Sequence, residues 1–461
     1  MSTETAPTPR PARGDELELT IDTLAYGGAG VARRDGYVVF VQGGMPGDRV
    51  RARVGKAKRA YAEARALEII EPGPDRIAPL AEHPGAPWQV LRYQRQLEVK
   101  EAQVAEALTR LGGLGEVQVD PIVPASETWR YRNKLEYSFG AEDTGRLICG
   151  FHAPGRWDEI VEVTDCLLAS EAANAARERI VAWCRAQGLA PYDRRTGAGL
   201  LRNLVVREGR RSGQLQARLV TAPGTLDTEA LAEAAAVDAV MWTRTDSVGE
   251  TTAGGDTDLI SGAHYLDEEI GGLRVRISPE AFFQTNTEMA ERLYAIAVER
   301  AQLTGFERVY DLFCGIGTIG LLMAPRAAEL WGLEVVPGAV ADAISNARRN
   351  EIEGAHFFAG DVRLALRDLV ERAGRPDVLV VDPPRAGLSQ KVVRRIIEAA
   401  PRRIVYVSCN PTTLAPNAAQ FVEAGYALGP VQPVDMFPQT PHIECVAVLD
   451  RLGPGPASPV S

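Results

Sequence analysis

The chain has 461 residues, of which 24% are charged and 45% hydrophobic, and its formal net charge is −10. This composition excludes a chain that is disordered throughout, and the length predicts about three domains. No apolar run reaches about 18 residues and the first residues contain no apolar core, so we expect neither a transmembrane helix nor a secretory signal.

The cysteines are scattered along the chain and form no C-x-x-C motif. Such spacing argues against a disulfide scaffold and favours a reducing cytosol. We therefore expect a cytoplasmic protein without a membrane partner, and we expect a monomer because nothing in the sequence requires a dimer. The cysteines are Cys149, Cys166, Cys184, Cys314, Cys409 and Cys445.

Residues 15–70 predict a small β-barrel. Short β-branched and aromatic runs alternate there with clustered glycines, as in LELTIDTLAYGGAGVARRDGYVVF. The segments 1–14 and 453–461 are rich in proline, serine and glycine, so we expect them to be flexible tails.

A basic stripe is predicted on one strand of this barrel. Arg49, Arg51 and Arg53 alternate with small apolar residues, which places the three arginines on one face of a strand. Two interpretations stay open: an ordinary solvated strand face, or a surface that binds phosphates.

The middle of the chain, residues 80–275, predicts a long helix followed by an antiparallel sheet. The stretches WRYRNKLEYSFG and LICGFH alternate as strands do, and Arg130, Arg132 and Lys134 would then share a face that either is solvated or binds a polyanion. The helix spans residues 91–112, where helical spacing puts an apolar face on Tyr93, Leu97, Val104, Leu108 and Leu111.

Residues 276–450 show a strand–helix rhythm. The apolar runs RVYDLF, ELWGLE, DVLVVD and IVYVSC are separated by helical segments. This alternation predicts an α/β fold with a doubly wound, parallel, Rossmann-like sheet, in which ligands bind at the carboxyl ends of the strands.

A glycine turn follows the first of these strands. Gly315, Gly317 and Gly320 satisfy G-x-G-x-x-G, which permits an NAD site. However, Asp311 just before the turn would repel a pyrophosphate and suits a ligand with an ammonium group. Glu334 ends the next strand, where an acid can bind two ribose hydroxyls. S-adenosylmethionine, which has an amino-acid end and a ribose but no phosphate, fits this pattern better than NAD.

Two later strands end in reactive side chains. Asp382 ends the run DVLVVD and is followed by two prolines, which turn the chain and hold the acid at the sheet edge. Cys409 ends the run IVYVSC at the same edge. A thiolate there makes sense if the methyl acceptor is C5 of a pyrimidine, because addition to C6 makes C5 nucleophilic.

Such a reaction also needs a base that removes the C5 proton. Glu444 stands at the start of the last apolar strand, in PHIECVAVL, and is the favoured candidate. His442 is the second candidate.

The motifs DLFCGIGTIGL, VDPPRAGL, VSCNPTTLA and HIECV, in this order, resemble those of the RNA uracil-C5 methyltransferases, which make 5-methyluridine in tRNA or 23S rRNA. SPEAFFQTN is similar to the family motif that precedes the catalytic domain. Residues 15–70 resemble the TRAM domain, an OB-like RNA-binding barrel. The resemblance implies that residues 80–275 form a central RNA-binding domain, that helix 91–112 can pack on the catalytic domain, and that residues 276–450 are the S-adenosylmethionine-dependent methyltransferase domain.

The resemblance also implies roles for individual residues. Cys409 would be the nucleophile that adds to C6, and Glu444 the base that takes the C5 proton. The last strand would run antiparallel, which places Glu444 near Cys409. Asp361, after the third strand, matches a weaker position on the adenine side. The residues implied to contact the cofactor S-adenosylmethionine are Gln284, Phe313, Glu334, Asp382 and Asp361.

The chain departs from the family pattern at one place. Several members hold an iron–sulfur cluster on four cysteines, but here the stretch EHPGAPWQ, residues 82–89, contains no cysteine. Only Cys166 stands where a ligand would be, and one thiolate does not hold such a cluster. We therefore predict no iron–sulfur cluster and no metal, and we interpret Cys166 as a structural relic.

Two other functions remain open from the residues alone. An NAD-dependent oxidoreductase would use the glycine turn but would need neither Cys409 nor Asp382. A catalytically inactive RNA-binding module would use the barrel alone, although the intact set of Asp382, Cys409 and Glu444 argues against lost activity.

Overall fold

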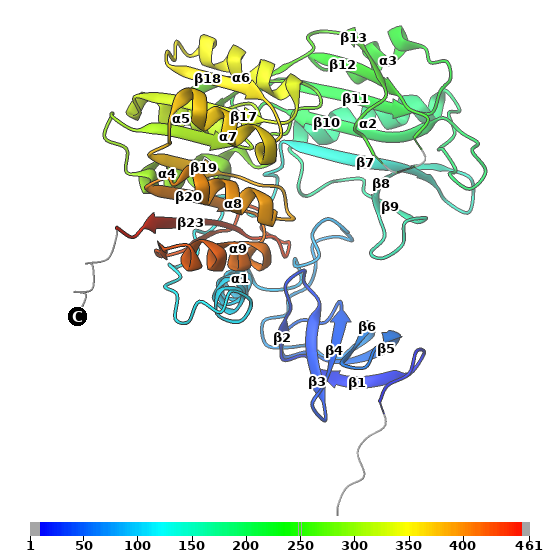
Figure 1. Ribbon diagram of the computed structural model, residues 1–461. Coiled ribbons are helices and arrows are strands. Elements are labelled where there is room, and N and C mark those ends of the chain that lie inside the picture. Colours follow the sequence, from blue (N-terminus) through cyan, green and yellow to red (C-terminus); the bar gives the residue numbers. More distant parts are fainter. Residues whose placement is uncertain (1–9, 248, 250, 454–461) are drawn as a thin grey trace, which may run out of the picture.

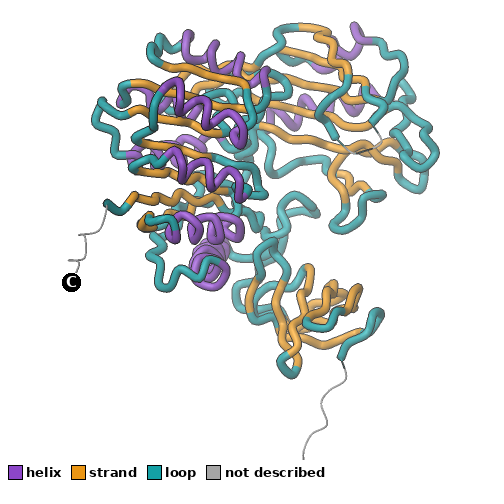
Figure 2. Tube along the Cα trace, viewed as in Figure 1, coloured by secondary structure: helices purple, strands orange, loops and turns teal. Residues whose placement is uncertain are grey.

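The computed structural model describes residues 10–247, 249 and 251–453, and Figure 1 shows the chain in sequence colours. Residues 1–9 and 454–461, which make up most of the two predicted tails, lie outside this range. Three large sheets and a two-stranded one organise the described part. The large ones lie near the amino terminus, in the centre and in the carboxyl-terminal half (Figure 2). Among the described residues, none of the helices combines the length and the apolar character needed to cross a bilayer.

The amino-terminal strands form the predicted barrel. Six strands pair in the order β1-β5-β6-β4-β3-β2. Alternate residues of β5 point into the barrel: Val50, Ala52 and Val54 are buried. The strands are β1 (Glu16–Thr20), β2 (Thr23–Leu24), β3 (Gly30–Arg34), β4 (Tyr37–Gln42), β5 (Arg49–Ala57) and β6 (Tyr61–Glu71).

The outward face of β5 carries the three predicted arginines, and each of them has an acidic partner on a neighbouring strand. The stripe is therefore a ladder of exposed ion pairs rather than a bare basic patch, which favours the interpretation as a solvated face. The pairs are Arg49–Glu71 at 2.5 Å, Arg51–Glu68 at 2.5 Å and Arg53–Glu16 at 2.7 Å.

A helix joins the barrel to the large sheet. Helix α1 (Tyr93–Glu106) continues into a π-helical turn, η1 (Ala107–Leu111), and the two pack against α9 (Pro411–Glu423). Val104 and Leu108 are fully buried in the same apolar core as that sheet. Leu111, predicted to lie on the buried face, is 57% exposed because the wider π-helical turn changes the helical spacing.

The central sheet has the order β13-β12-β11-β10-β7-β8-β9. It is antiparallel except for the pair β11–β12, which is parallel. Helices α2 (Glu171–Ala186) and α3 (Thr228–Ala235) contact each other and pack on it. The strands are β7 (Lys134–Ala141), β8 (Leu147–His152), β9 (Ile160–Glu162), β10 (Leu201–Glu208), β11 (Leu215–Thr221), β12 (Ala239–Arg244) and β13 (Asp256–Ser261).

Arg130, Arg132 and Lys134 do not share one strand, so that prediction is wrong. Strand β7 begins only at Lys134, and Arg130 has a left-handed backbone with φ of 52° and forms an ion pair with Asp165 at 2.9 Å. The turn at Arg130 interrupts the alternation of side chains along the chain, so Arg130 and Arg132 do not share a strand face with Lys134.

The large sheet confirms the predicted Rossmann-like fold. Its order is β18-β17-β16-β19-β20-β23-β21, parallel except that β23 runs antiparallel to its neighbours, and β22 also pairs with β23. The strand order reverses between β16 and β19, and ligands bind at such a switch point. The strands are β16 (Arg308–Leu312), β17 (Glu329–Glu334), β18 (Ala355–Ala359), β19 (Val378–Val381), β20 (Arg403–Ser408), β21 (Tyr426–Leu428), β22 (Gln432–Val434) and β23 (Glu444–Arg451).

Helices and a hairpin surround this sheet (Figure 1). Asn286 caps the helix that precedes the first strand, and Ser389 and Asn410 cap later ones through side-chain bonds to backbone N–H groups. The elements are the hairpin β14 (Leu266–Ile270) and β15 (Leu273–Ile277), and the helices α4 (Thr287–Ala301), α5 (Thr318–Met323), η2 (Ala324–Arg326), α6 (Pro337–Arg349), α7 (Val362–Ala373) and α8 (Gln390–Ala399).

Candidate active site

A cavity of about 690 Å³ opens at the carboxyl ends of the parallel strands. Asp361 does not line it. Its carboxylate instead caps α7, where it accepts from the N–H of Arg363 at 2.8 Å, and forms an ion pair with the Arg363 guanidinium. All the other predicted site residues line this cavity: Gln284, Phe313, Glu334, Asp382, Cys409 and Glu444.

The glycine turn shapes one wall of this cavity. Gly315 and Gly317 have φ values of 55° and 85°, in the left-handed region that favours glycine. A Cβ on Gly317 would lie 3.1 Å from the ring of Phe357. Gly317 therefore packs closely against Phe357, whereas Gly315 has open space at its Cβ position and lines the cavity.

Glu334 is fixed at the end of β17. Its carboxylate accepts from the N–H of Gly315 at 3.2 Å and from that of Val336 at 2.9 Å. These two bonds orient the acid beside the glycine turn, where it lines the cavity. A carboxylate held in this way suits a ligand with neighbouring hydroxyl groups, such as a ribose.

Three further carboxyl groups line the same cavity: Asp311 and Glu444, which are buried, and Asp382, which is partly exposed. Burial raises the pKa of Asp311 to about 8 and that of Asp382 to about 7, and it raises the pKa of Glu444 well above its usual range. One oxygen each of Asp311 and Glu444 has no hydrogen-bond partner among the described residues. A cationic ligand would stabilise these carboxylates, so the cavity fits a molecule with an ammonium and a sulfonium group.

Cys409 directly follows β20 and is half-buried, whereas the other cysteines are buried. Burial raises the pKa of its thiol to about 12, and the neighbouring carboxylates of Glu444 and Asp382 act in the same direction. The Arg385 guanidinium opposes them. At neutral pH the ligand-free protein therefore holds a thiol, and the thiolate requires a further cation or a base.

The register of two antiparallel strands brings Cys409 and Glu444 together. Ser408 of β20 pairs with Cys445 of β23. The next position in the same register sets Cys409 opposite Glu444, and opposed residues of an antiparallel pair have Cβ atoms about 5 Å apart on one face.

His442 also lines the cavity. Burial, together with the charges of Arg385, Arg132 and Lys100, lowers its pKa to about 4. The imidazole is therefore neutral at pH 7.

The sequence analysis missed three residues at this site. Arg132 and Arg385 line the cavity and bring positive charge to a wall otherwise rich in acids. Tyr26, from the barrel, donates its hydroxyl hydrogen to the carbonyl oxygen of Cys409 at 3.4 Å. Arg385 follows the D-P-P turn, which is a signal that was available, but no sequence pattern links Tyr26 to a cysteine 383 positions away.

A histidine from residues 82–89 lies next to Cys166. His83 Nε2 lies 3.2 Å from the sulfur of Cys166, and both residues are buried. Burial lowers the pKa of His83 to about 4, so the ring is neutral. Within the described part of the chain, no group of three or more His, Cys, Asp or Glu side chains is arranged to hold a metal ion.

Known proteins resemble this chain in both sequence and fold. A family model described as tRNA (uracil-5-)-methyltransferase matches residues 263–452, and a TRAM-domain model matches residues 11–67. An uncharacterized RNA methyltransferase of Gloeobacter violaceus is 39% identical over 455 residues, which cover 95% of this chain and 97% of that protein. One of Halalkalibacterium halodurans is 37% identical over 448 residues, with 95% and 97% covered.

A solved structure extends the similarity over nearly the whole fold. The tRNA (uracil-54, C5)-methyltransferase of Pyrococcus abyssi, in complex with S-adenosyl-L-homocysteine, superposes with a TM-score of 0.76 and 27% sequence identity. The match covers 94% of this chain and 100% of that one.

Proposed function

Because this chain belongs to the tRNA (uracil-5-)-methyltransferase family of S-adenosylmethionine-dependent RNA methyltransferases, we propose that it methylates C5 of a uridine in tRNA or 23S rRNA. The reaction runs through a covalent bond between Cys409 and C6 of the base. The observation that carries this proposal is the strand register that sets Cys409 opposite Glu444 in a cavity lined by acids.

Residues that line the cavity suit the separate groups of the methyl donor. Glu334 would hold the ribose hydroxyls and Asp311 the ammonium group, with Phe313 and Asp382 beside them. Gln284 is buried and lines the same cavity, and it would contact the donor or the target base. When bound, S-adenosylmethionine supplies an electrophilic methyl group on a positively charged sulfur. Asp361 remains a candidate on the adenine side only if its bond to Arg363 opens.

The chemistry balances with two side chains of this protein. The Cys409 thiolate forms a bond to C6, and the electrons of the C5–C6 double bond move to C5 and the O4 enolate. C5 then bonds to the methyl carbon, and the bond from that carbon to the sulfonium sulfur breaks. Glu444 takes the C5 proton, the double bond forms again, and Cys409 leaves as a thiolate.

The raised pKa values at this site are compatible with this order of reaction steps. Burial raises the pKa values of Cys409 and Glu444, and neighbouring carboxylates raise them further, whereas the guanidinium of Arg385 acts in the opposite direction. Both would fall towards neutrality once a cation is bound next to them. Thiolate formation is thereby tied to an occupied donor site. C5 and C6 of a stacked uridine are inaccessible, so the target base must be unstacked or flipped out.

Trapping on 5-fluorouridine RNA tests the covalent step, because a fluorine at C5 leaves no proton for Glu444 to remove. We expect an adduct with the intact protein that survives denaturation, and none with Cys409→Ala. Cys184→Ala, which removes a buried thiol outside the cavity, is the matched control and should form the adduct normally. An intact protein that binds S-adenosylmethionine but forms no adduct would refute the mechanism.

The target RNA is tested separately. Mass-spectrometric mapping of 5-methyluridine in RNA from cells with and without the gene should show one lost site in tRNA or 23S rRNA.

A thermal-shift comparison of S-adenosylmethionine with NAD tests the cofactor and should show stabilisation by the former alone. Stabilisation by NAD would instead support the oxidoreductase hypothesis.

A further inference from the structure

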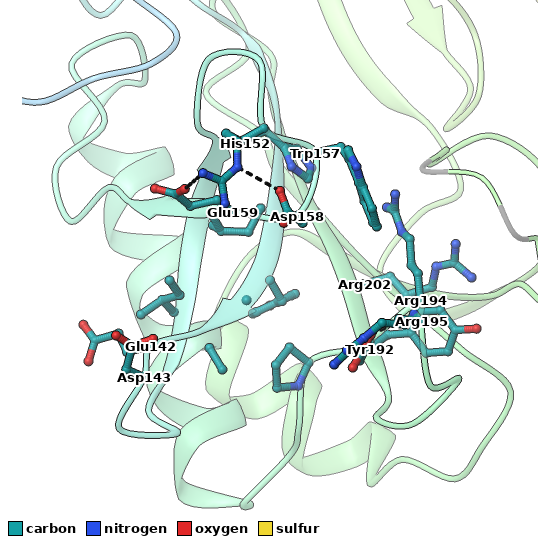
Figure 3. Close-up of a pocket in the computed structure, with 18 of the residues that line it drawn as sticks. Glu142, Asp143, His152, Trp157, Asp158, Glu159, Tyr192, Arg194, Arg195 and Arg202 are labelled. Carbon is teal, nitrogen blue, oxygen red and sulfur yellow. Dashed lines mark hydrogen bonds and ion pairs between the residues drawn. The ribbon is translucent and has the colours of Figure 1, made fainter. Parts of the chain in front are cut away.

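A second cavity, of about 1110 Å³, lies at the far end of the central sheet (Figure 3). The ends of β7 and β8, the loop that leads to β9, and residues 191–202 form its walls. None of the predicted catalytic or cofactor-binding residues lines it. Its chemistry is therefore independent of the methyl-transfer site.

An exposed tryptophan dominates one side of this cavity. Trp157, in the loop between β8 and β9, is 65% exposed. In Figure 3 its indole lies on the same side of the cavity as Arg194 and Arg202, away from Glu142 and Asp143. An aromatic face left open to solvent next to arginines is what single-stranded nucleic-acid sites offer to an unstacked base.

The wall next to Trp157 is already ordered. The guanidinium of Arg202 lies 4.8 Å from the centre of the Tyr192 ring and donates to the carbonyl oxygen of Gly249 at 2.7 Å. The side chain of Arg202 is nearly buried. Little conformational entropy is then lost when a base binds against this wall.

Charge is distributed unevenly over the cavity. Asp158 and Glu159 form ion pairs with Arg156 at 3.1 and 3.3 Å, and Glu142 is paired with Arg146. On the other wall Arg194 and Arg195 stand beside one acid, Asp193, whose pKa is lowered by hydrogen bonds and by the charge of Arg195. An anion such as a phosphate is therefore attracted to the arginine wall.

Strand β7 connects the two cavities. Arg132, two residues before β7, lines the catalytic cavity, and Asn133 donates to the carbonyl oxygen of Gln284 at 2.9 Å, whereas Phe139 in the second half of the strand lines the second cavity. The chain from Arg132 to Phe139, at up to about 3.3 Å per residue, spans at most roughly 23 Å. About seven stacked nucleotides cover that distance, at roughly 3.4 Å each.

We propose that this second cavity is a subsite for an unpaired nucleotide of the RNA substrate, whose base stacks on Trp157 while its phosphate binds Arg195. The proposal rests on the proposed function, because it takes RNA as the substrate of the catalytic cavity. The subsite would hold the RNA at a fixed distance from the target uridine and contribute to the choice of site.

Binding of unmodified tRNA and 23S rRNA transcripts to the full chain tests the proposal. We expect Trp157→Ala to weaken the binding of the substrate transcript about tenfold, as loss of one stacked base does, without changing the salt dependence. Trp157→Phe should restore most of the affinity. Arg195→Ala should weaken binding and also lower the slope of log affinity against log salt by about one.

Control variants distinguish RNA binding at the second cavity from the methylation reaction. Arg367→Ala removes a surface arginine that is 68% exposed on α7, and it should leave RNA affinity unchanged. Binding of S-adenosylmethionine should be the same in every variant. RNA affinity that is unchanged within twofold in Trp157→Ala would overturn the subsite. Affinity that depends on Trp157 in a protein that forms no adduct would support the subsite and refute the proposed mechanism.

Discussion

The buried ion pair between Lys100 and Asp435 anchors the segment that leads into Glu444, and breaking it should destabilise the protein strongly. The two side chains are fully buried, and their charged atoms lie 2.6 Å apart. Asp435 also accepts from the hydroxyl of Tyr93 at 2.8 Å, and Lys100 donates to the carbonyl oxygen of Phe437 at 3.1 Å. Asp435→Ala would leave a buried ammonium with one acceptor, at a cost of about 3–5 kcal/mol in the free energy of unfolding.

A double variant separates the cost of the unpaired charge from the loss of the ion pair. Lys100→Met combined with Asp435→Ala removes both charges, so the double variant should be more stable than Asp435→Ala alone by about 2 kcal/mol. Burial lowers the pKa of Lys100, and Asp435→Ala removes the group that opposes this effect. The unfolded state then binds more protons below its own pKa of about 10.4, so the stability deficit should shrink as pH rises towards 10.

Urea unfolding, followed by circular dichroism and by tryptophan fluorescence, measures these differences, provided the two signals change together. Glu371→Ala is the matched control, because it breaks an exposed pair with Arg367 on α7 and should cost less than about 0.5 kcal/mol. A loss below about 1 kcal/mol for Asp435→Ala, or a double variant no more stable than it, would refute the reasoning.

The remaining predictions concern the catalytic cavity. Iodoacetamide should alkylate Cys409 in the RNA-free protein at a rate that still rises beyond pH 10, because the pKa of its thiol is about 12. Glu444→Gln should lower that pKa. A rate, followed by mass spectrometry, that reaches a plateau near pH 8.5 in the intact protein would contradict this. Tyr26→Phe removes the bond to the Cys409 carbonyl and should slow single-turnover adduct formation about two- to fivefold with unchanged binding of S-adenosylmethionine; an unchanged rate would show that the contact is catalytically silent. Glu334→Gln should weaken binding of S-adenosylmethionine by about tenfold or more in calorimetry, and equal affinities would remove Glu334 from the donor site.

Periodicity and motif order predicted the large sheet well. The run ELWGLE is strand β17 to the residue. The edge where ligands bind also followed from the sequence, because parallel strands place their carboxyl ends together and Asp382 and Cys409 each directly follow such a strand. These are local patterns, and the doubly wound topology turns them into a shared site.

Long-range contacts were not predictable in the same way. Arg132 reaches the catalytic cavity only because the left-handed turn at Arg130 interrupts the alternation before β7. The arginines of β5 read as a basic stripe because their acidic partners lie on other strands, far along the chain. Asp361 has the sequence context of a ligand-binding acid, yet its carboxylate is taken by the start of α7 and by Arg363.

The seam between the barrel and the catalytic half has a consequence for protein engineering. A Cβ on Gly28 would press on the indole nitrogen of Trp88 at 3.1 Å and on Pro441 at 3.2 Å. Leu24 of the barrel packs in one cluster with Trp88 and Leu91. Truncation before this seam would uncover apolar surface, and a chimaera with a foreign barrel would lose the Tyr26 hydroxyl. The amino-terminal barrel therefore contributes packing contacts and a hydroxyl group to the catalytic half, which a barrel from another protein would not replace.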